Sequence, residues 1–232
     1  MNIHIPNLEY TFYGPIVLLS IVIGIIIACI LMRNAGVKSS TSFYTAIFTF
    51  ISILVCSAVL SISITGDVRK VGFVGAGGAL GLIVGAVTSA LIHRDHISES
   101  MSAWIIVAPL MYGLSKIGCH LAGCCNGIPY NGFFTITYAE KGHISYFPIQ
   151  ITETIVFVLI FIIGLILYLK SKNKTRVAIF TLLLSGIAKI GLEFLRESHI
   201  GHVITSYQII VLSISLIGAV SLHLTNRSAK AE

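Results

Sequence analysis

Residues 13–32 read YGPIVLLSIVIGIIIACILM, twenty consecutive positions without a charged side chain. At 1.5 Å per residue, an α-helix of this length spans about 30 Å, the thickness of the hydrocarbon core of a bilayer. A helix is expected, because a segment in lipid must satisfy its own backbone hydrogen bonds. This stretch therefore predicts a transmembrane helix and decides the class of the protein.

Six more apolar stretches follow along the chain. They fall at residues 43–64, 71–92, 103–121, 151–169, 177–195 and 205–224. The 232 residues are 56% apolar and 10% charged, with a mean hydropathy of +0.94, whereas soluble domains are roughly 45–50% apolar and about 25% charged. A water-soluble protein is excluded. We predict an all-α polytopic membrane protein with seven transmembrane helices in a single domain, residues 1–232.

The basic residues between these stretches predict the orientation. Connections on one side hold nine of them: Arg33, Lys38, Arg94, Lys170, Lys172, Lys174, Arg176, Arg227 and Lys230. Connections on the other side hold three: Arg69, Lys70 and Lys141. The positive-inside rule then places the N-terminus outside and the C-terminus in the cytoplasm. The net charge of +6 follows this bias, so no nucleic-acid partner is expected.

The N-terminal apolar run is too long for a cleavable signal peptide, and no Lys or Arg precedes it, so we expect the first helix to be retained. One long connection, at about 122–150, lies on the outer side. Its glycines and prolines are typical of turns, and its six aromatic residues argue against disorder. Long loops inside compact proteins are usually functional, so we expect this loop to close over a site.

Glycines in the third stretch recur at a four-residue spacing, at positions 77, 81 and 85. Such a face lets another backbone approach closely, which favours helix packing. A groove for a lipid chain, with Gly77 and Gly78 contacting the substrate, is the alternative.

Ionisable residues inside membrane spans are costly and indicate function. Lys116, Glu153 and Arg196 are predicted at a similar depth on three different helices, near the outer surface. They could enclose a polar pocket beneath the long loop. Lys189 and Glu193 share a helix face with each other, so neutralisation within one helix is the alternative.

Three of the five cysteines, Cys119, Cys124 and Cys125, cluster with His120 in the sequence. A thiol nucleophile, a disulfide or metal site, and apolar packing are the competing interpretations. Adjacent cysteines with one histidine match no standard metal-ligand spacing, so no metal and no cofactor are expected. A disulfide between Cys119 and Cys124 stays open on an oxidising side. Cys29 and Cys56 lie in plain apolar helix and are expected in the core.

Several motifs follow one another in a characteristic order. These are GAGG at 75–78, KIGCHLAGCCNG at 116–127, PIQITE at 148–153, EFLRE at 193–197 and SYQ at 206–208. Together they resemble the His-Gly-Gly, Arg-x-Gly-Asn with Asn-Gly-Glu, Pro-Ser-Gln-x-x-Glu, Glu-Phe-Phe-Arg and Met-Gly-Gln segments of the prolipoprotein diacylglyceryl transferase family. Members of that family are seven-helix enzymes of the bacterial plasma membrane.

The resemblance implies transfer of diacylglycerol from phosphatidylglycerol to the thiol of a prolipoprotein cysteine, with release of glycerol phosphate. It implies that Arg196 recognises the phosphate. It also implies that Gln150, Glu153, Glu193 and Gln208 orient the site, and we expect Asn126 to contact the substrate as well. The partners implied are phosphatidylglycerol or a related phospholipid, a prolipoprotein or other thiol acceptor, and the bilayer.

The sequence departs from the family at four positions. The reactive histidine falls on Ala76, the signature arginine on Lys116, the asparagine on Cys119 and the following glutamate on Cys124. Lysine keeps the positive charge but loses the planar fork of arginine. We expect His120 to replace the missing base, and Cys119 or Cys124 to act as an intermediate thiol.

Three functions remain open at this stage. The first is the family reaction, in which a diacylglyceryl group moves to a prolipoprotein thiol. The second is a divergent paralogue that transfers a phospholipid-derived group to another acceptor through a Cys/His site. The third is a non-enzymatic transporter or binding protein for an anion or thiol compound. Release of glycerol phosphate from phosphatidylglycerol distinguishes the enzymes from the transporter.

Overall fold

The computed structural model describes residues 2–5, 8, 10–92, 96–142 and 144–228. Within these residues, seven helices run along the chain: α1 (Tyr13–Asn34), α2 (Ser39–Thr65), α3 (Gly75–Ile92), α4 (Ile97–Leu121), α5 (Ile149–Lys170), α6 (Lys174–Glu193) and α7 (Ser206–Ser228). The described residues also contain three strands: β1 (Asn2–Ile5), β2 (Thr135–Tyr138) and β3 (Ser145–Tyr146). Short 3₁₀ helices are η1 (Tyr10–Phe12), η2 (Val68–Lys70), η4 (Ala139–Lys141) and η5 (Glu197–His199).

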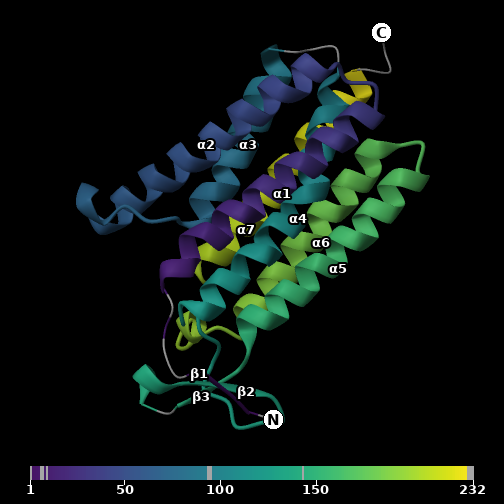
Figure 1. Ribbon diagram of the computed structural model, residues 1–232. Helices are drawn as coiled ribbons and strands as arrows, with labels where there is room; N and C mark the ends of the chain where they lie inside the picture. Colours follow the sequence, from purple (N-terminus) through teal and green to yellow (C-terminus); the bar gives the residue numbers. More distant parts are fainter. Residues whose placement is uncertain (1, 6–7, 9, 93–95, 143, 229–232) are drawn as a thin grey trace.

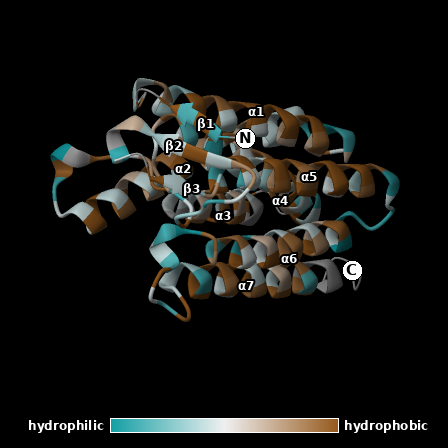
Figure 2. Cartoon of the chain, turned by 90° about the horizontal axis from the view of Figure 1, so that it is seen from below, coloured by the Kyte–Doolittle hydropathy of each residue, from teal (hydrophilic) through white to brown (hydrophobic). Residues whose placement is uncertain are grey.

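Six of these helices are long and apolar enough to cross a membrane: α1, α2, α4, α5, α6 and α7. The apolar part of α3 that the structure describes, Gly77–Ser89, is shorter. α1 begins and α7 ends at opposite ends of the bundle (Figure 1). Hydrophobic residues cover the helices, and hydrophilic ones gather at the turns (Figure 2). This is the surface of a polytopic membrane protein. Arg94 and Lys230, which entered the orientation argument, lie outside the described residues.

The bundle is not purely helical, because the N-terminal segment and the long loop form a small sheet below the helices (Figure 1). β1 pairs in parallel with β2, with His4 opposite Thr137, and β2 pairs antiparallel with β3. Ile136, Tyr138 and Tyr146 of the loop are buried. The helical class agrees with the prediction, whereas this small sheet was not predicted, because strands of two to four residues are too short to leave a periodic pattern.

α3 begins four residues later than predicted, because residues 71–74 are not helical. Two serines of α2 satisfy the backbone of this segment. The Gly72 N–H donates to Ser61 Oγ at 2.9 Å, and the Val74 N–H donates to Ser57 Oγ at 2.7 Å. Serine and threonine hydroxyls are one of the means by which membrane proteins satisfy non-helical backbone.

The glycine face of α3 packs against α2. A Cβ atom at Gly77 would lie 2.6 Å from Ser57 Cα, and at Gly81 and Gly85 it would collide with the α2 backbone. Helix packing is therefore what this stripe does in the structure. Gly77 and Gly78 were expected to bind substrate, but α2 and the Phe73 ring, respectively, occupy their open faces.

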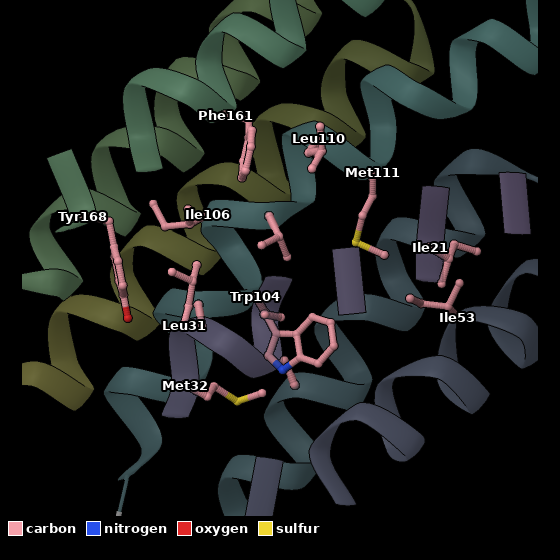
Figure 3. Packing of buried hydrophobic residues seen from close by; sticks show 14 of the residues in the cluster. Ile21, Leu31, Met32, Ile53, Trp104, Ile106, Leu110, Met111, Phe161 and Tyr168 are labelled. Carbon is pink, nitrogen blue, oxygen red and sulfur yellow. The ribbon is translucent and has the colours of Figure 1, made fainter. Parts of the chain in front are cut away.

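α4 is the central helix, and its side chains are buried on several sides. Trp104 is fully buried, and Figure 3 shows it among side chains from α1, α2, α4 and α5, including Ile21, Met32, Ile53 and Phe161. This core holds α4 and α5 in fixed positions. The site described below lies where these two helices meet the loops beneath them.

Candidate functional site

Five charged residues from the α4, α5 and α6 regions form one buried network, here called the ion cluster: Lys116, Glu153, Lys189, Glu193 and Arg196. Glu153 of α5 is its centre and is 0% exposed. Its carboxylate accepts from Lys189 Nζ at 2.9 Å and from an Arg196 guanidinium nitrogen at 2.6 Å, and Lys116 Nζ lies 3.6 Å away. The structure thus brings together Lys116, Glu153 and Arg196, as the sequence predicted.

The ion cluster contains three cations and two carboxylates, a surplus of one positive charge. Lys189 also lies 2.8 Å from Glu193, and Arg196 Nε lies 3.4 Å from the same carboxylate oxygen. Within the described part of the chain, this buried Nε makes no hydrogen bond. A buried charge that lacks a counterion is costly. The network is therefore suited to receive one more negative group.

Sequence reasoning missed Tyr112, which belongs to the same network. Its hydroxyl donates to Glu153 Oε1 at 2.9 Å, and Lys116 Nζ lies 4.7 Å from the centre of its ring. Tyr112 precedes Lys116 by four residues and so shares its helix face. That spacing was the one available signal.

Arg196 was predicted at the outer end of the sixth helix, but α6 ends at Glu193. Instead, Arg196 lies in an extended segment that pairs with the loop after α4. Ile128 N–H donates to the Leu195 carbonyl at 3.0 Å, and Glu197 N–H donates to the Asn126 carbonyl at 3.1 Å. The loop between α4 and α5 therefore positions Arg196 through backbone bonds.

The end of α4 and the loop after it carry a second group of side chains, the sulfur cluster, made of Cys119, Cys124 and Cys125. Their sulfur atoms all lie within 4.8 Å of one another. Cys119 is buried, Cys124 is half-buried and Cys125 is exposed. No disulfide forms among the five cysteines, all of which belong to the described residues.

Side chains from other elements hold this turn in place. Gln150 Nε2 donates to the Cys124 carbonyl at 2.8 Å and to Tyr138 Oη at 3.2 Å. Lys141 Nζ donates to the Gly123 carbonyl at 2.7 Å. With its amide oriented to match its neighbours, Asn126 donates to the same carbonyl and accepts from Lys141. Gln150 and Asn126 thus position the cysteines and lie outside the ion cluster.

The two clusters influence each other electrostatically. Hydrogen bonds from the Cys119 and Cys124 thiols, together with the positive charges of Lys116 and Arg196, lower the pKa of Cys125. The Cys124 thiol donates hydrogen bonds to the sulfurs of Cys119 and Cys125, and this raises the pKa of Cys124. The arrangement therefore stabilises negative charge on sulfur next to the ion cluster.

Three expected residues belong to neither cluster. His120 is half-buried in the last turn of α4, and its Nδ1 has no hydrogen-bond partner among the described residues. Gln208 accepts from the Thr205 N–H at 2.9 Å and donates to the Ile190 carbonyl at 3.2 Å, which ties α7 to α6. Ala76 belongs to the first turn of α3, and its side chain lies outside the described part.

Comparison with known proteins adds independent information. The family described as prolipoprotein diacylglyceryl transferase matches residues 1–224. The phosphatidylglycerol–prolipoprotein diacylglyceryl transferase of Clostridium tetani is 26% identical over 227 residues, which cover 89% of each chain. The phosphatidylglycerol–prolipoprotein diacylglyceryl transferase 2 of Clostridium perfringens is 28% identical over 162 residues, which cover 67% of this chain and 63% of that protein.

Proposed function

This chain belongs to the prolipoprotein diacylglyceryl transferase family, and we propose that it is a membrane transferase. It moves a diacylglyceryl group from phosphatidylglycerol to the thiol of a prolipoprotein cysteine. The reaction is a substitution at the glyceryl carbon that bears the phosphate ester. It needs a cationic site for the phosphate, an activated thiol and a route for the proton.

The ion cluster is the observation that carries this proposal. A phosphodiester bears one negative charge, and the cluster has one surplus positive charge. Arg196 offers the planar guanidinium fork that fits phosphate oxygens, and Lys116 adds a point charge from α4. Glu153 holds both cations in place, because its carboxylate accepts from Arg196 at 2.6 Å and lies 3.6 Å from Lys116 Nζ. As the leaving phosphate gains charge, the same cations stabilise it.

The acceptor side of the reaction belongs to the turn after α4. Cys119 and Cys124 belong to the sulfur cluster, whose Cys125 is acted on by the charges of Lys116 and Arg196. We assign His120 as the base that replaces the family histidine, whose position Ala76 occupies. Gln150, Glu193 and Gln208 hold the elements around the substrate. The buried Nδ1 of His120, free of other bonds in the described chain, supports this role.

We further propose that all seven helices cross a bacterial plasma membrane, with the N-terminus outside. α3 and residues 71–74 together give a segment whose backbone groups are bonded to α2. The side that is poor in Lys and Arg then carries the sheet and both clusters. An exported prolipoprotein would meet the site on that side.

A second acceptor class has a specific observation in its favour. Four family positions are changed, and two of the new residues, Cys119 and Cys124, belong to the sulfur cluster. A paralogue that transfers the group to a different thiol compound would retain the ion cluster and alter this turn.

The test uses purified protein in nanodiscs that contain phosphatidylglycerol. Glycerol phosphate is measured after addition of a prolipoprotein peptide with its cysteine, of the same peptide with serine, of a small thiol compound, or of no acceptor. We expect release with the cysteine peptide alone. Release that requires a small thiol compound would establish the paralogue. No release with any thiol would reject both enzymes and leave the non-enzymatic binding protein.

A further inference from the structure

We propose that Cys119, Cys124 and Cys125 bind one zinc ion, and that the thiol of the acceptor supplies its fourth ligand. The adjacency of Cys124 and Cys125 made a metal site improbable from the sequence. The fold changes that assessment, because a third sulfur from the end of α4 approaches both.

The distances suit a tetrahedral ion. Zinc binds cysteine sulfur at about 2.3 Å, which places two sulfur ligands about 3.8 Å apart. The three sulfurs already lie within 4.8 Å of one another. Zinc binding would therefore bring the sulfurs at most about 1 Å closer together. Zinc also has no redox chemistry, so such a site functions without an electron donor.

The backbone of the turn directs two neighbouring cysteines to one place. Cys125 has φ of +57°, the one non-glycine residue with positive φ in the described chain, and Gly123 has φ of +60°. The left-handed conformation is unfavourable for a side chain and persists where surrounding contacts impose it. Here Gln150 and Lys141 hold the carbonyls of Cys124 and Gly123. Metal sites commonly depend on such outer hydrogen bonds.

Three protein ligands are the number found in catalytic zinc sites, in which the fourth position takes water or substrate. Cys119 is buried while Cys125 is exposed, so a fourth ligand can approach from the Cys125 side.

The chemical role of this site rests on the proposed function. Coordination replaces the acceptor S–H bond by an S–Zn bond and releases the proton, for which His120 is the base assigned above. The bound sulfur then forms a bond to the glyceryl carbon, the C–O bond to phosphate breaks, and the electron pair leaves on the oxygen of glycerol phosphate. The thioether product is a weaker ligand than a thiolate and dissociates. Zinc coordination would activate the acceptor thiol without the family histidine, whose position Ala76 occupies.

The first experiment measures metal without measuring activity. Reduced protein is stripped with a chelator, reloaded with zinc sulfate, desalted and analysed for zinc per chain. We expect one zinc per chain, lost in each of Cys119→Ser, Cys124→Ser and Cys125→Ser. Cys29→Ser and Cys56→Ser, in α1 and α2, are the matched controls and should keep it. Wild-type protein without stoichiometric zinc, or zinc retained in Cys124→Ser and Cys125→Ser, would overturn the site.

The second experiment replaces zinc with cobalt(II) in the wild-type protein, so no variant needs to fold. We expect the thiolate–cobalt absorption to change on addition of the cysteine peptide and not of the serine peptide. An identical spectrum with both peptides would overturn the acceptor role. Glycerol phosphate release that survives chelation would also overturn it, while the proposed function would stand. Stoichiometric zinc with no release from phosphatidylglycerol would reject the proposed function instead, and with it the catalytic role.

Discussion

Glu153 shows how one residue can organise a site inside a membrane. It is fully buried, and three cations and one tyrosine hydroxyl converge on its carboxylate. Removing one partner from a buried ionic group costs about 3–5 kcal/mol, because the remaining charges stay desolvated. Glu153 therefore stabilises the three helix ends as well as the phosphate site.

This predicts a large stability loss for Glu153→Gln. The amide retains the size of the side chain but leaves Lys116, Lys189 and Arg196 with Glu193 as their one remaining carboxylate in the cluster. We expect a loss of roughly 3–5 kcal/mol, measured as a lower thermal unfolding midpoint in detergent. Glu197→Gln is the control, since it removes the same charge from an exposed position nearby. Equal midpoints for the two variants would contradict this role.

Arg196 tests the phosphate assignment at the same scale. Arg196→Lys keeps the charge near Glu153 but loses the planar fork, so the donors no longer match the phosphate oxygens. We expect glycerol phosphate release to fall by about a hundredfold, the typical effect of losing one donor to a developing anion. Arg176→Lys, at the exposed start of α6, should leave release unchanged. Normal turnover in a folded Arg196→Lys protein would remove this residue from the site.

At the scale of elements, the contact between α2 and α3 depends on the absence of side chains. Gly77, Gly81 and Gly85 allow the α2 backbone to approach directly, and Ser57 and Ser61 then reach the non-helical residues 71–74. Lipid tails are as apolar as helix side chains, so the hydrophobic effect does not drive helices together inside a membrane. Close packing is therefore a main source of helix association there.

Gly81→Ala should therefore weaken this helix pair. The added methyl group would collide with the backbone at Ser52 and Ile53, and overpacking costs about 1–3 kcal/mol. Gly75→Ala, at the start of the same helix, meets no atom within 4 Å and is the matched control. Thermal unfolding of both variants in detergent gives the comparison. A Gly81→Ala protein as stable as Gly75→Ala would show that the two helices separate easily.

On the scale of the whole molecule, the helices meet the small sheet at the end where both clusters lie. The long loop supplies β2 and β3, and through Gln150, Tyr138 and Lys141 it connects the sheet to the cysteine turn. Backbone bonds from the same loop position Arg196. The loop is therefore a structural part of the site.

Cutting the loop should lower activity without unfolding the helices. A protease site inserted between Gly132 and Phe133 would be accessible, because Phe133 is 86% exposed. We expect glycerol phosphate release to fall after cleavage, because the cut frees β2 and β3 from one end and admits water to the charged site. An equivalent insertion beside exposed Lys172, in the α5–α6 turn, is the control. Full activity after complete cleavage would mean that the loop is a simple connector.

The sequence alone determined the membrane class, the positions of the helices and the convergence of Lys116, Glu153 and Arg196. Hydrophobic length and the cost of buried charge are local properties, so they can be read without coordinates. The family motifs added the reaction. Even the glycine stripe was correctly assigned to helix packing, since its spacing depends on one helix only.

The tertiary structure decided what depends on contacts between distant segments. The pairing of β1 with β2 joins residues more than a hundred positions apart, and no short pattern encodes it. The Tyr112 hydroxyl donates to a carboxylate on another helix. Arg196 lies beyond the end of its predicted helix, in a segment whose backbone pairs with a loop. The sulfur cluster arose in the same way, because a positive φ at Cys125 and bonds from Gln150 and Lys141 turned two adjacent cysteines toward a third. Such arrangements depend on packing and backbone geometry, which linear spacing does not record.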